Sequence, residues 1–462
     1  MNRIHIFNLI MAFGALSVQG MKPAVDLNQS VGFSDRSRIC FSDHPDWDAH
    51  SAEMIRQRYD LYRQAGCQMV RIHTLWNAFE QVEGQWNDAA CDTLLDEVKR
   101  SGFKVKLIAG VIMSPPSWYL EKNPDAQMVD QFGQYSRNCI SYWYPGLEEV
   151  LESKLRRILQ TLEKKDMLQQ VEYILVDLGP AGEGIYPANW TMDSTPGHET
   201  RDDEAFACYS RLAQQDFRKQ MKAKYSSIEK ADKAWGTSFA DWEAVEIPQP
   251  GTITGTFWED MLYWYRDSKR KVFRMQIRNV SERIKEFNLQ AKPLVYLPGS
   301  CMLPQDIQAG AEIGGGGHPV RLMIDNEYLM QVANSYGCIL QNTGFENLPE
   351  VLRMKERMKR DGVDSSKVWG ENAGHIRGAG DPIYLAKIVI EENLWGLDYT
   401  HTRFVLKDDF ITPNQRYIQL KEAVRLIRQY YEEGKVPDFN RYYAEDSEIK
   451  SKINGCRDKS AH

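Results

Sequence analysis

The 462-residue sequence lacks a surplus of positive charge. Its formal net charge is −7, and no long run of basic residues occurs. A protein that binds nucleic acid carries a basic patch or stripe for the phosphates. The charge balance therefore argues against a nucleic-acid partner.

Several catalytic and ligand-binding motifs are also missing. The eight cysteines contain no C-x-x-C pair, so neither a zinc site nor a dense disulfide framework is expected, although an isolated disulfide stays open. There is no H-E-x-x-H, no close pair of histidines and no G-x-S-x-G elbow. The glycines 314–317 follow no strand pattern and precede no Lys-Ser/Thr, which excludes a phosphate loop. No metal or cofactor is expected.

The apolar run near the N-terminus is too short to cross a bilayer. It extends from Ile6 to Val18, follows Arg3 and ends in small residues. This pattern predicts a secretory signal over residues 1–20, and no cysteine follows closely enough for a lipoprotein. We therefore expect export, to the periplasm or beyond, and no membrane span.

Aromatic residues, by contrast, are abundant, with 12 Trp and 22 Tyr. Any single one fits a buried core position equally well. Several stand beside Gly, Pro or Asn, where loops are expected. Together they suit a cleft in which flat rings stack on sugar rings.

Short apolar strands alternate with amphipathic helices along the chain, with no internal repeat. The predicted strands are a first one between Val31 and Phe41, then 69–73, 104–109, 173–177, 293–297, 337–341, 367–370 and 399–405. Eight strands separated by helices predict an α/β fold, a (β/α)8 TIM barrel with right-handed crossovers. The barrel would occupy residues 21–440, with a large, mostly helical insertion after strand four at about 188–290. Residues 441–462 would form a polar tail.

The last helix has the clearest local signals. Thr412 is the expected N-cap, Pro413 the first helical residue, and Gln415 the capping-box residue. Gly434 should end the helix. An apolar stripe at helical spacing would close the barrel, formed by Tyr417, Leu420, Val424, Ile427 and Tyr431.

Two glutamates follow predicted strands at the start of Gly-bearing loops. Glu183 follows strand four, and Glu371 follows strand seven. In a parallel barrel such residues face one cavity at the carboxyl ends of the strands. Glycoside hydrolysis needs two carboxyl groups, one holding a proton and one attacking the anomeric carbon or activating water. Glu183 is the predicted acid and Glu371 the predicted nucleophile or base.

Other polar and aromatic residues lie near strand ends and are candidates for substrate binding, although a structural role fits each of them as well. They are Arg71, His73, Trp76, Trp118, Tyr186, Asn342, Asn372 and His401. Arg71 could orient a carboxylate through a forked hydrogen bond. Asp325 and Glu327 form a rival carboxylate pair, but the sequence that follows favours the start of a helix.

Residues 76–84 (WNAFEQVEG) and 114–118 (SPPSW) resemble the second- and third-strand loops of family 42 β-galactosidases. Residues 225–229 (YSSIE) and 234–237 (AWGT) are also similar to that family. The resemblance implies a (β/α)8 barrel and a retaining mechanism, with Glu183 as acid/base and Glu371 as nucleophile. One position departs from it, because the family has Asn before the acid and this chain has Gly182.

Residues 179–183 (GPAGE), with Tyr186 and Pro187, look instead like the acid motif of β-amylases. The motif implies inversion, with a strand-seven Glu acting through water. We therefore expect an exo-acting glycoside hydrolase for an oligo- or polysaccharide, β-galactosidase-like and retaining. An inverting β-amylase-like α-glucan hydrolase and a non-catalytic carbohydrate-binding barrel stay open as alternatives.

Overall fold

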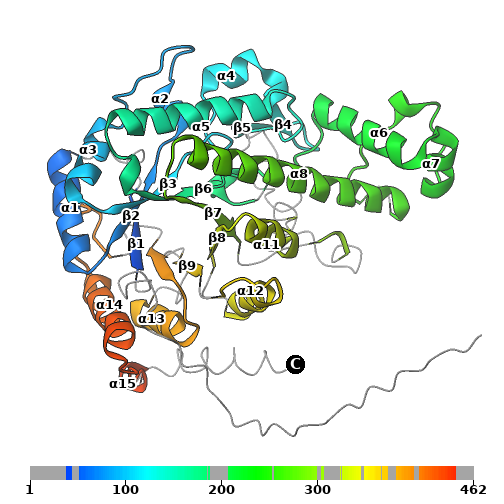
Figure 1. Ribbon diagram of the computed structural model, residues 1–462. Coiled ribbons are helices and arrows are strands. Elements are labelled where there is room, and N and C mark those ends of the chain that lie inside the picture. The colour runs from blue at the N-terminus through cyan, green and yellow to red at the C-terminus, as the bar shows by residue number, and fades with distance from the viewer. Residues whose placement is uncertain are drawn as a thin grey trace, which may run out of the picture.

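Eight parallel strands close into a barrel in the computed structural model of the chain (Figure 1). The structure describes residues 38–43, 51–184, 186–187, 206–251, 254–298, 303–305, 323, 325–344, 348–365, 367–372, 381–399 and 405–443. The barrel strands are β1 Arg38–Asp43, β2 Met69–His73, β3 Lys104–Ile108, β6 Val171–Leu175, β7 Lys292–Leu297, β8 Ile339–Asn342, β9 Val368–Asn372 and β10 Gly396–Tyr399. They follow one another around the ring in chain order, and β10 pairs with β1. The predicted (β/α)8 barrel is confirmed.

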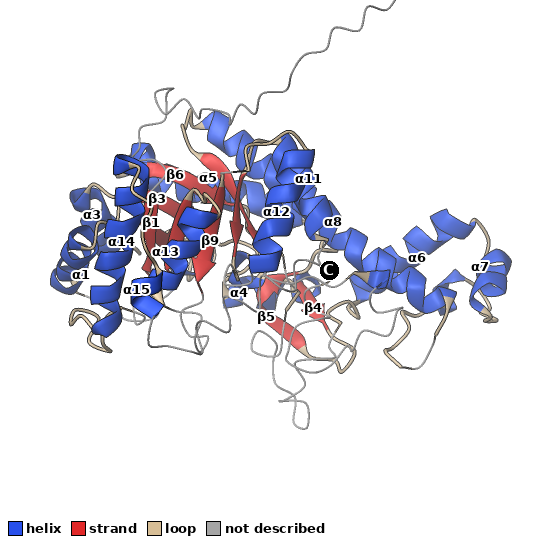
Figure 2. Ribbon diagram, turned by 90° about the horizontal axis from the view of Figure 1, so that it is seen from below, coloured by secondary structure: helices blue, strands red, loops and turns tan. Residues whose placement is uncertain are grey.

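Helices surround the strands (Figure 2). They are α1 Ala52–Gln64, α2 Trp76–Phe79, α3 Asp92–Ser101, α4 Ser117–Lys122, α5 Leu147–Lys164, α6 Arg211–Tyr225, α7 Ile228–Trp235, α8 Thr256–Glu286, α11 Asn326–Ser335, α12 Leu348–Arg360, α13 Pro382–Glu391, α14 Gln415–Glu433 and α15 Asn440–Tyr443. A separate antiparallel hairpin, β4 Gln127–Val129 with β5 Tyr135–Ile140, lies between β3 and β6. None of the helices among the described residues is long and apolar enough to cross a membrane.

Helix α5 shows how the pattern of apolar residues forms the outer layer. Its buried side chains include Leu151, Leu155, Ile158 and Leu162, spaced three or four residues apart, and Leu159 beside them. That spacing places them on one face of the helix, which packs on the barrel wall. Glu148 and Glu149 lie in its first turn, where carboxylates favour the helix dipole.

The predicted insertion after the fourth barrel strand is helical where the structure describes it. Helices α6 and α7 extend away from the barrel, and the 31-residue helix α8 runs from them back to β7 (Figures 1 and 2). Aromatic rings fill the junction: Tyr186 stacks on Tyr265 with ring centroids 3.8 Å apart, and Trp143 stacks on Trp264 at 5.2 Å. The projection is therefore packed against the barrel through α8.

Three local predictions need correction. The last barrel strand begins at Gly396, not Tyr399, because its first residue packs against Trp369; a Cβ at Gly396 would lie 2.6 Å from that ring. The first strand reaches Asp43, two residues beyond the expected end. Strand β8 begins at Ile339, because Gly337 with φ of +66° ends the preceding helix.

Helix α14 is capped by Asn414, whose side chain accepts from the Arg416 amide, and not by Thr412. Pro413 instead pairs with Leu406 in an isolated bridge, and the Thr412 amide donates to Asp409 at 2.8 Å. The end at Gly434, with φ of +66°, and the buried apolar stripe are confirmed.

Several predictions fall outside the described residues. These are the signal segment 1–20, the glycines 314–317, and the tail beyond Tyr443. The signal segment and the tail stay predictions. The six described cysteines are buried and unpaired with one another, as expected of small hydrophobic side chains: Cys40, Cys67, Cys91, Cys139, Cys208 and Cys338.

Candidate active site

Charged and polar side chains meet inside the carboxyl-terminal end of the barrel, which we call the barrel mouth. Five of them form what we call the central cluster, each from a different strand: Arg71 (β2), Lys106 (β3), Gln341 (β8), Glu371 (β9) and Asp398 (β10). All five are buried. Apolar inward residues such as Met69, Leu294 and Ile339 lie in the core layer below them.

Glu371 is held at both carboxylate oxygens. Arg71 Nη1 donates to Oε1 at 2.8 Å, and Gln341 Nε2 donates to Oε2. The phenol of Tyr296, at the end of β7, accepts a second bond from Arg71 at 2.9 Å. Charge-assisted bonds of this kind are strong and directional. The carboxylate is therefore fixed in orientation, as a nucleophile or base requires.

Asp398 and Lys106 lie beside Glu371 and Arg71, since Asp398 pairs in register with Glu371, and Lys106 with Arg71. Lys106 Nζ donates to Asp398 Oδ2 at 3.0 Å and to Gln341 Oε1 at 2.6 Å. Arg71 also lies 3.4 Å from Asp398. Burial would raise the pKa of Asp398, but the charges of Arg71 and Lys106 outweigh burial and hold that pKa below its ordinary value. The cluster thus pairs two cations with two carboxylates.

Glu183 lies in the loop after β6, residues 176–184, which we call the acid loop. Its side chain is half-buried, and it follows a single 3-10 turn, Pro180–Gly182. Gly182 has φ of +73°, and a Cβ there would lie 2.3 Å from Leu175 Cδ2. A side chain here would require Leu175 to shift and would have to adopt a left-handed backbone, which glycine adopts without strain.

The two glutamates stand on opposite sides of the barrel mouth. Glu371 is the last but one residue of β9, inside the strand and not after it, and Glu183 follows β6; three steps around the eight-stranded ring separate these strands. Because all strands are parallel, both residues lie at the same end of the barrel. A sugar bound over the mouth would therefore have one carboxyl group on each side.

Trp76 and Trp118 lie near Glu80, in short helices and not in the loops expected after β2 and β3: Trp76 begins α2, and Trp118 is in α4. Trp76 donates to the Glu80 carboxylate at 2.6 Å, Trp118 donates to the Glu80 carbonyl at 2.7 Å, and Lys154 pairs with the same carboxylate. The rings meet edge to face at 6.1 Å. Trp76 is fully buried, whereas Trp118 is half-buried. Of the two rings, Trp118 is the better placed to contact a ligand.

The structure brings only some of the other candidates to the mouth. His73 ends β2 and is half-buried. Asn342 ends β8, but its side chain is used within the fold. Its Nδ2 donates to the sulfur of Met354, and its Oδ1 accepts from the backbone N–H of Gly344, so it supports its own loop. Tyr186 is buried, and its hydroxyl donates to the Tyr265 carbonyl at 2.7 Å. Asn372 is the last residue of β9. His401 lies outside the described residues.

Sequence reasoning missed Lys106, Tyr296, Gln341 and Asp398, as well as Asp177 at the start of the acid loop. A signal for them exists. Parallel barrel strands are buried on both faces and read as continuous apolar runs, so a charged or amide residue inside such a run marks the mouth. The alternative pair Asp325 and Glu327 does begin a helix, since Asp325 caps α11 and accepts the Tyr328 amide at 3.1 Å.

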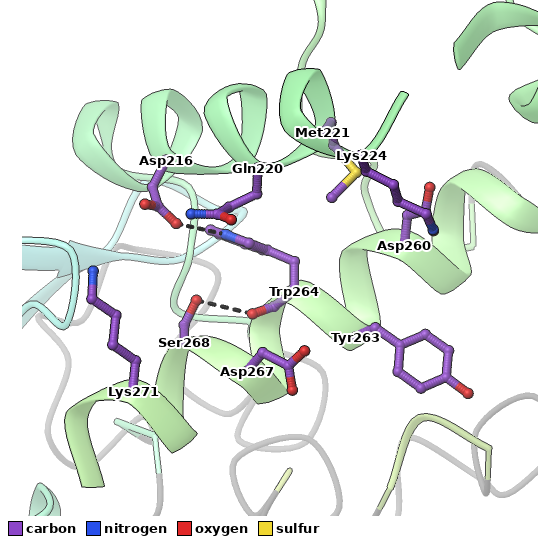
Figure 3. A pocket seen from close by; sticks show the side chains of 10 residues that line it. All are labelled: Asp216, Gln220, Met221, Lys224, Asp260, Tyr263, Trp264, Asp267, Ser268 and Lys271. Carbon is purple, nitrogen blue, oxygen red and sulfur yellow. Dashed lines mark hydrogen bonds and ion pairs between the residues drawn. The ribbon is translucent and has the colours of Figure 1, made fainter. Parts of the chain in front are cut away.

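A hollow lies between α6 and α8, with a volume of about 380 Å³, and its lining residues are none of those at the barrel mouth (Figure 3). Its three carboxylates are already engaged: Asp216 accepts from Trp264, Asp260 from Lys224, Tyr225 and Trp235, and Asp267 pairs with Arg266 and Arg270. These contacts stabilise the projection. Among the described residues, no three His, Cys, Asp or Glu side chains are grouped as metal ligands would be.

Comparison with known proteins agrees with this geometry. The sequence profile of glycoside hydrolase family 42, described as beta-galactosidase, matches residues 45–178 and 181–295, more than half of the chain. A thermophilic beta-amylase from Thermoanaerobacterium thermosulfurigenes is 27% identical over 217 residues, which cover 41% of this chain and 37% of that protein. A beta-galactosidase from Thermus thermophilus is 28% identical over 230 residues, covering 46% of this chain and 32% of that one. The chain thus spans about a third of the length of these curated relatives.

Solved structures show the same fold. The catalytic domain of beta-amylase from Paenibacillus polymyxa superposes with a TM-score of 0.68 at 18% identity, covering 86% of this chain and 99% of that domain. A beta-galactosidase from Marinomonas ef1 gives 0.58 at 13% identity, covering 87% and 61%. With the profile match over more than half of its length, the chain belongs to glycoside hydrolase family 42, the beta-galactosidase family.

Proposed function

We propose that this chain hydrolyses O-glycosidic bonds of an oligo- or polysaccharide from a chain end, with Glu183 as general acid/base and Glu371 as nucleophile. Family membership supports the reaction class. The observation that carries the residue assignment is the carboxylate of Glu371, fixed by Arg71 and Gln341 at the barrel mouth. A β-galactosidase-like, retaining reaction is the first candidate.

In this mechanism the scissile bond lies between the two glutamates. Glu183 protonates the leaving-group oxygen while Glu371 attacks the anomeric carbon, which forms a covalent glycosyl-enzyme. Glu183, now deprotonated, then takes a proton from water, and that water displaces Glu371. Arg71 and Tyr296 keep the Glu371 carboxylate oriented during both steps. The reaction requires no metal or cofactor.

The second candidate is inverting, β-amylase-like hydrolysis of an α-glucan. The geometry of Gly182 favours it, because a side chain at this position would require Leu175 to shift, and glycine offers no side-chain amide to the sugar 2-hydroxyl. The relatives named beta-amylase support the same alternative. In this reaction Glu371 would activate a water molecule, and the two carboxyl groups would stand farther apart.

The test compares Glu183→Gln and Glu371→Gln with the wild type on aryl β-galactosides and on malto-oligosaccharides. Each substitution should lower kcat by about 10²–10⁴-fold, because a neutral amide can neither donate the proton nor attack. Glu327→Gln is the matched control, since Glu327 lies on α11 and pairs with Arg357 and Arg360. It should keep full activity.

The anomer of the first-formed product, followed by NMR on the active substrate, separates retention from inversion. Two results would overturn the proposal: full activity in both glutamate variants, or carbohydrate binding by the wild type with no turnover of either substrate class. The second result would support the non-catalytic alternative.

A further inference from the structure

The side chain of Asp177 accepts hydrogen bonds from four backbone amides at the barrel mouth. It is 2% exposed and occupies the inward position after Leu175. One oxygen, Oδ2, accepts the amides of Val111 and Ile112 at 2.8 Å and of Met113 at 3.3 Å. The other, Oδ1, accepts the amide of Gly179 at 3.2 Å.

These four bonds join two loops that the proposed reaction needs. Residues 111–113 belong to the loop after β3, which leads to Trp118, and Gly179 opens the turn that presents Glu183. The backbone of Asp177 is fixed as well, because Gln276 of α8 donates to its carbonyl at 2.8 Å. Asp177 therefore lies where three elements meet: the β3 loop, the acid loop and α8.

A buried carboxylate without a cationic partner is costly for a fold. Burial raises the pKa of Asp177 to about 6, although the four amides act in the opposite direction. Arg71 and Lys106 of the central cluster pair with Glu371 and Asp398, and none of the described Lys or Arg side chains forms an ion pair with Asp177. A neutral residue would relieve the cost of burial. Unlike a neutral amide, a carboxylate accepts hydrogen bonds at both of its oxygens, as Asp177 does here.

We propose that Asp177 is a positioning residue for the reaction: its two oxygens fix the acid loop against the β3 loop, so that Glu183 faces Glu371 across the sugar. The inference rests on the proposed function. Asp177 touches neither carboxylate of the proposed pair, and acts through the backbone of residues 179–183.

Asp177→Asn tests this with a nearly isosteric change. The amide oxygen can still accept from residues 111–113, but the NH2 group then faces the Gly179 N–H, donor against donor. The acid loop should lose its anchor while the β3 loop keeps its own. We expect kcat to fall by roughly 10–100-fold, since a misplacement of 1 Å can cost 10²-fold, while KM changes by less than about threefold.

Amide hydrogen exchange supplies a readout that does not depend on activity. In the wild type, the amides of residues 111, 112 and 179 should exchange slowly. In Asp177→Asn, exchange should accelerate at residues 179–183 and stay slow at 111–113. Asp232→Asn is the matched control, because Asp232 accepts the Phe239 amide at 3.0 Å in the distant α7 unit. It should alter neither the acid loop nor kcat.

Three results would overturn the inference: rapid exchange at Gly179 in the wild type, unchanged kcat in folded Asp177→Asn, or a fall in kcat without faster exchange at 179–183. The last would mean that Asp177 acts through its charge. If Glu183→Gln were fully active, the proposed function would fail, whereas the exchange result would still report whether Asp177 anchors the loop.

Discussion

Lys106 is a charged residue with no exposed surface, and its environment explains how the fold tolerates it. Its ammonium lies 3.0 Å from Asp398 and 3.9 Å from the centroid of the Trp369 ring. Taking an ion out of water costs several kcal/mol, which a paired charge and further hydrogen bonds can offset. The same ammonium holds Asp398 and Gln341 in place beside Glu371.

Removing one member of this buried pair should be costly. We expect Lys106→Met to lower the free energy of unfolding by about 3–5 kcal/mol, because Asp398 loses its nearest cation. The double variant Lys106→Met/Asp398→Asn should be less destabilised than the sum of the two single changes. Urea unfolding of the four proteins measures this coupling, and strictly additive values would contradict it.

The site was predictable from the sequence only in part, and the reason lies in chain distance. Arg71 and Glu371 are 300 positions apart, yet Arg71 lies in the predicted second strand and Glu371 directly follows the predicted seventh, so the barrel rule brings them together. Lys106 and Asp398 are 292 positions apart. Lys106 lies inside the predicted strand 104–109, where its direction depends on register, and Asp398 precedes the predicted strand 399–405 by one residue. A shift of one residue would have turned them outward.

At the scale of elements, helix α14 shows that local sequence signals predict a helix but not which residue caps it. Thr412 and Asn414 are both suitable caps, two residues apart, and sequence alone favoured the first. The bridge between Leu406 and Pro413 holds the chain extended up to Asn414, so the helix begins after it. Strand existence was predictable in the same way, whereas strand ends such as Gly396 depended on contacts with other strands.

The two caps predict different stabilities. Asn414→Ala should cost about 1 kcal/mol, because the Arg416 amide loses its acceptor. Thr412→Ala removes only an exposed hydroxyl contact with Asp409 and should cost less than about 0.5 kcal/mol. Thermal or urea unfolding of both variants checks the order, and the reverse order would restore Thr412 as the cap.

At the scale of the whole molecule, Asp177 makes stability depend on pH. Its pKa is raised from 3.8 to about 6 by burial, so the folded state holds this proton more tightly than the unfolded chain. Its contribution to stability is therefore present below about pH 4 and is lost as pH rises through about 6. The facing groups Cys139 and Tyr142 have pKa values raised by burial and stay neutral across this window.

Asp177→Asn should remove this dependence. The free energy of unfolding of the variant, relative to the wild type, should increase between pH 4 and pH 7 by up to about 3 kcal/mol. Urea unfolding of both proteins at the two pH values isolates the effect, because all other titrations are shared. A difference that does not change with pH would contradict the raised pKa.

Helix α8 has a mechanical consequence for the molecule. This helix of 31 residues carries α6 and α7 at its N-terminal end, and about two-thirds of the way along it Gln276 donates to the carbonyl of Asp177. A displacement at one end of so long a helix moves the rest of the helix with it. A force on the projecting helices would therefore be carried along α8 to Gln276, which is one hydrogen bond from the segment that presents Glu183, the proposed proton donor.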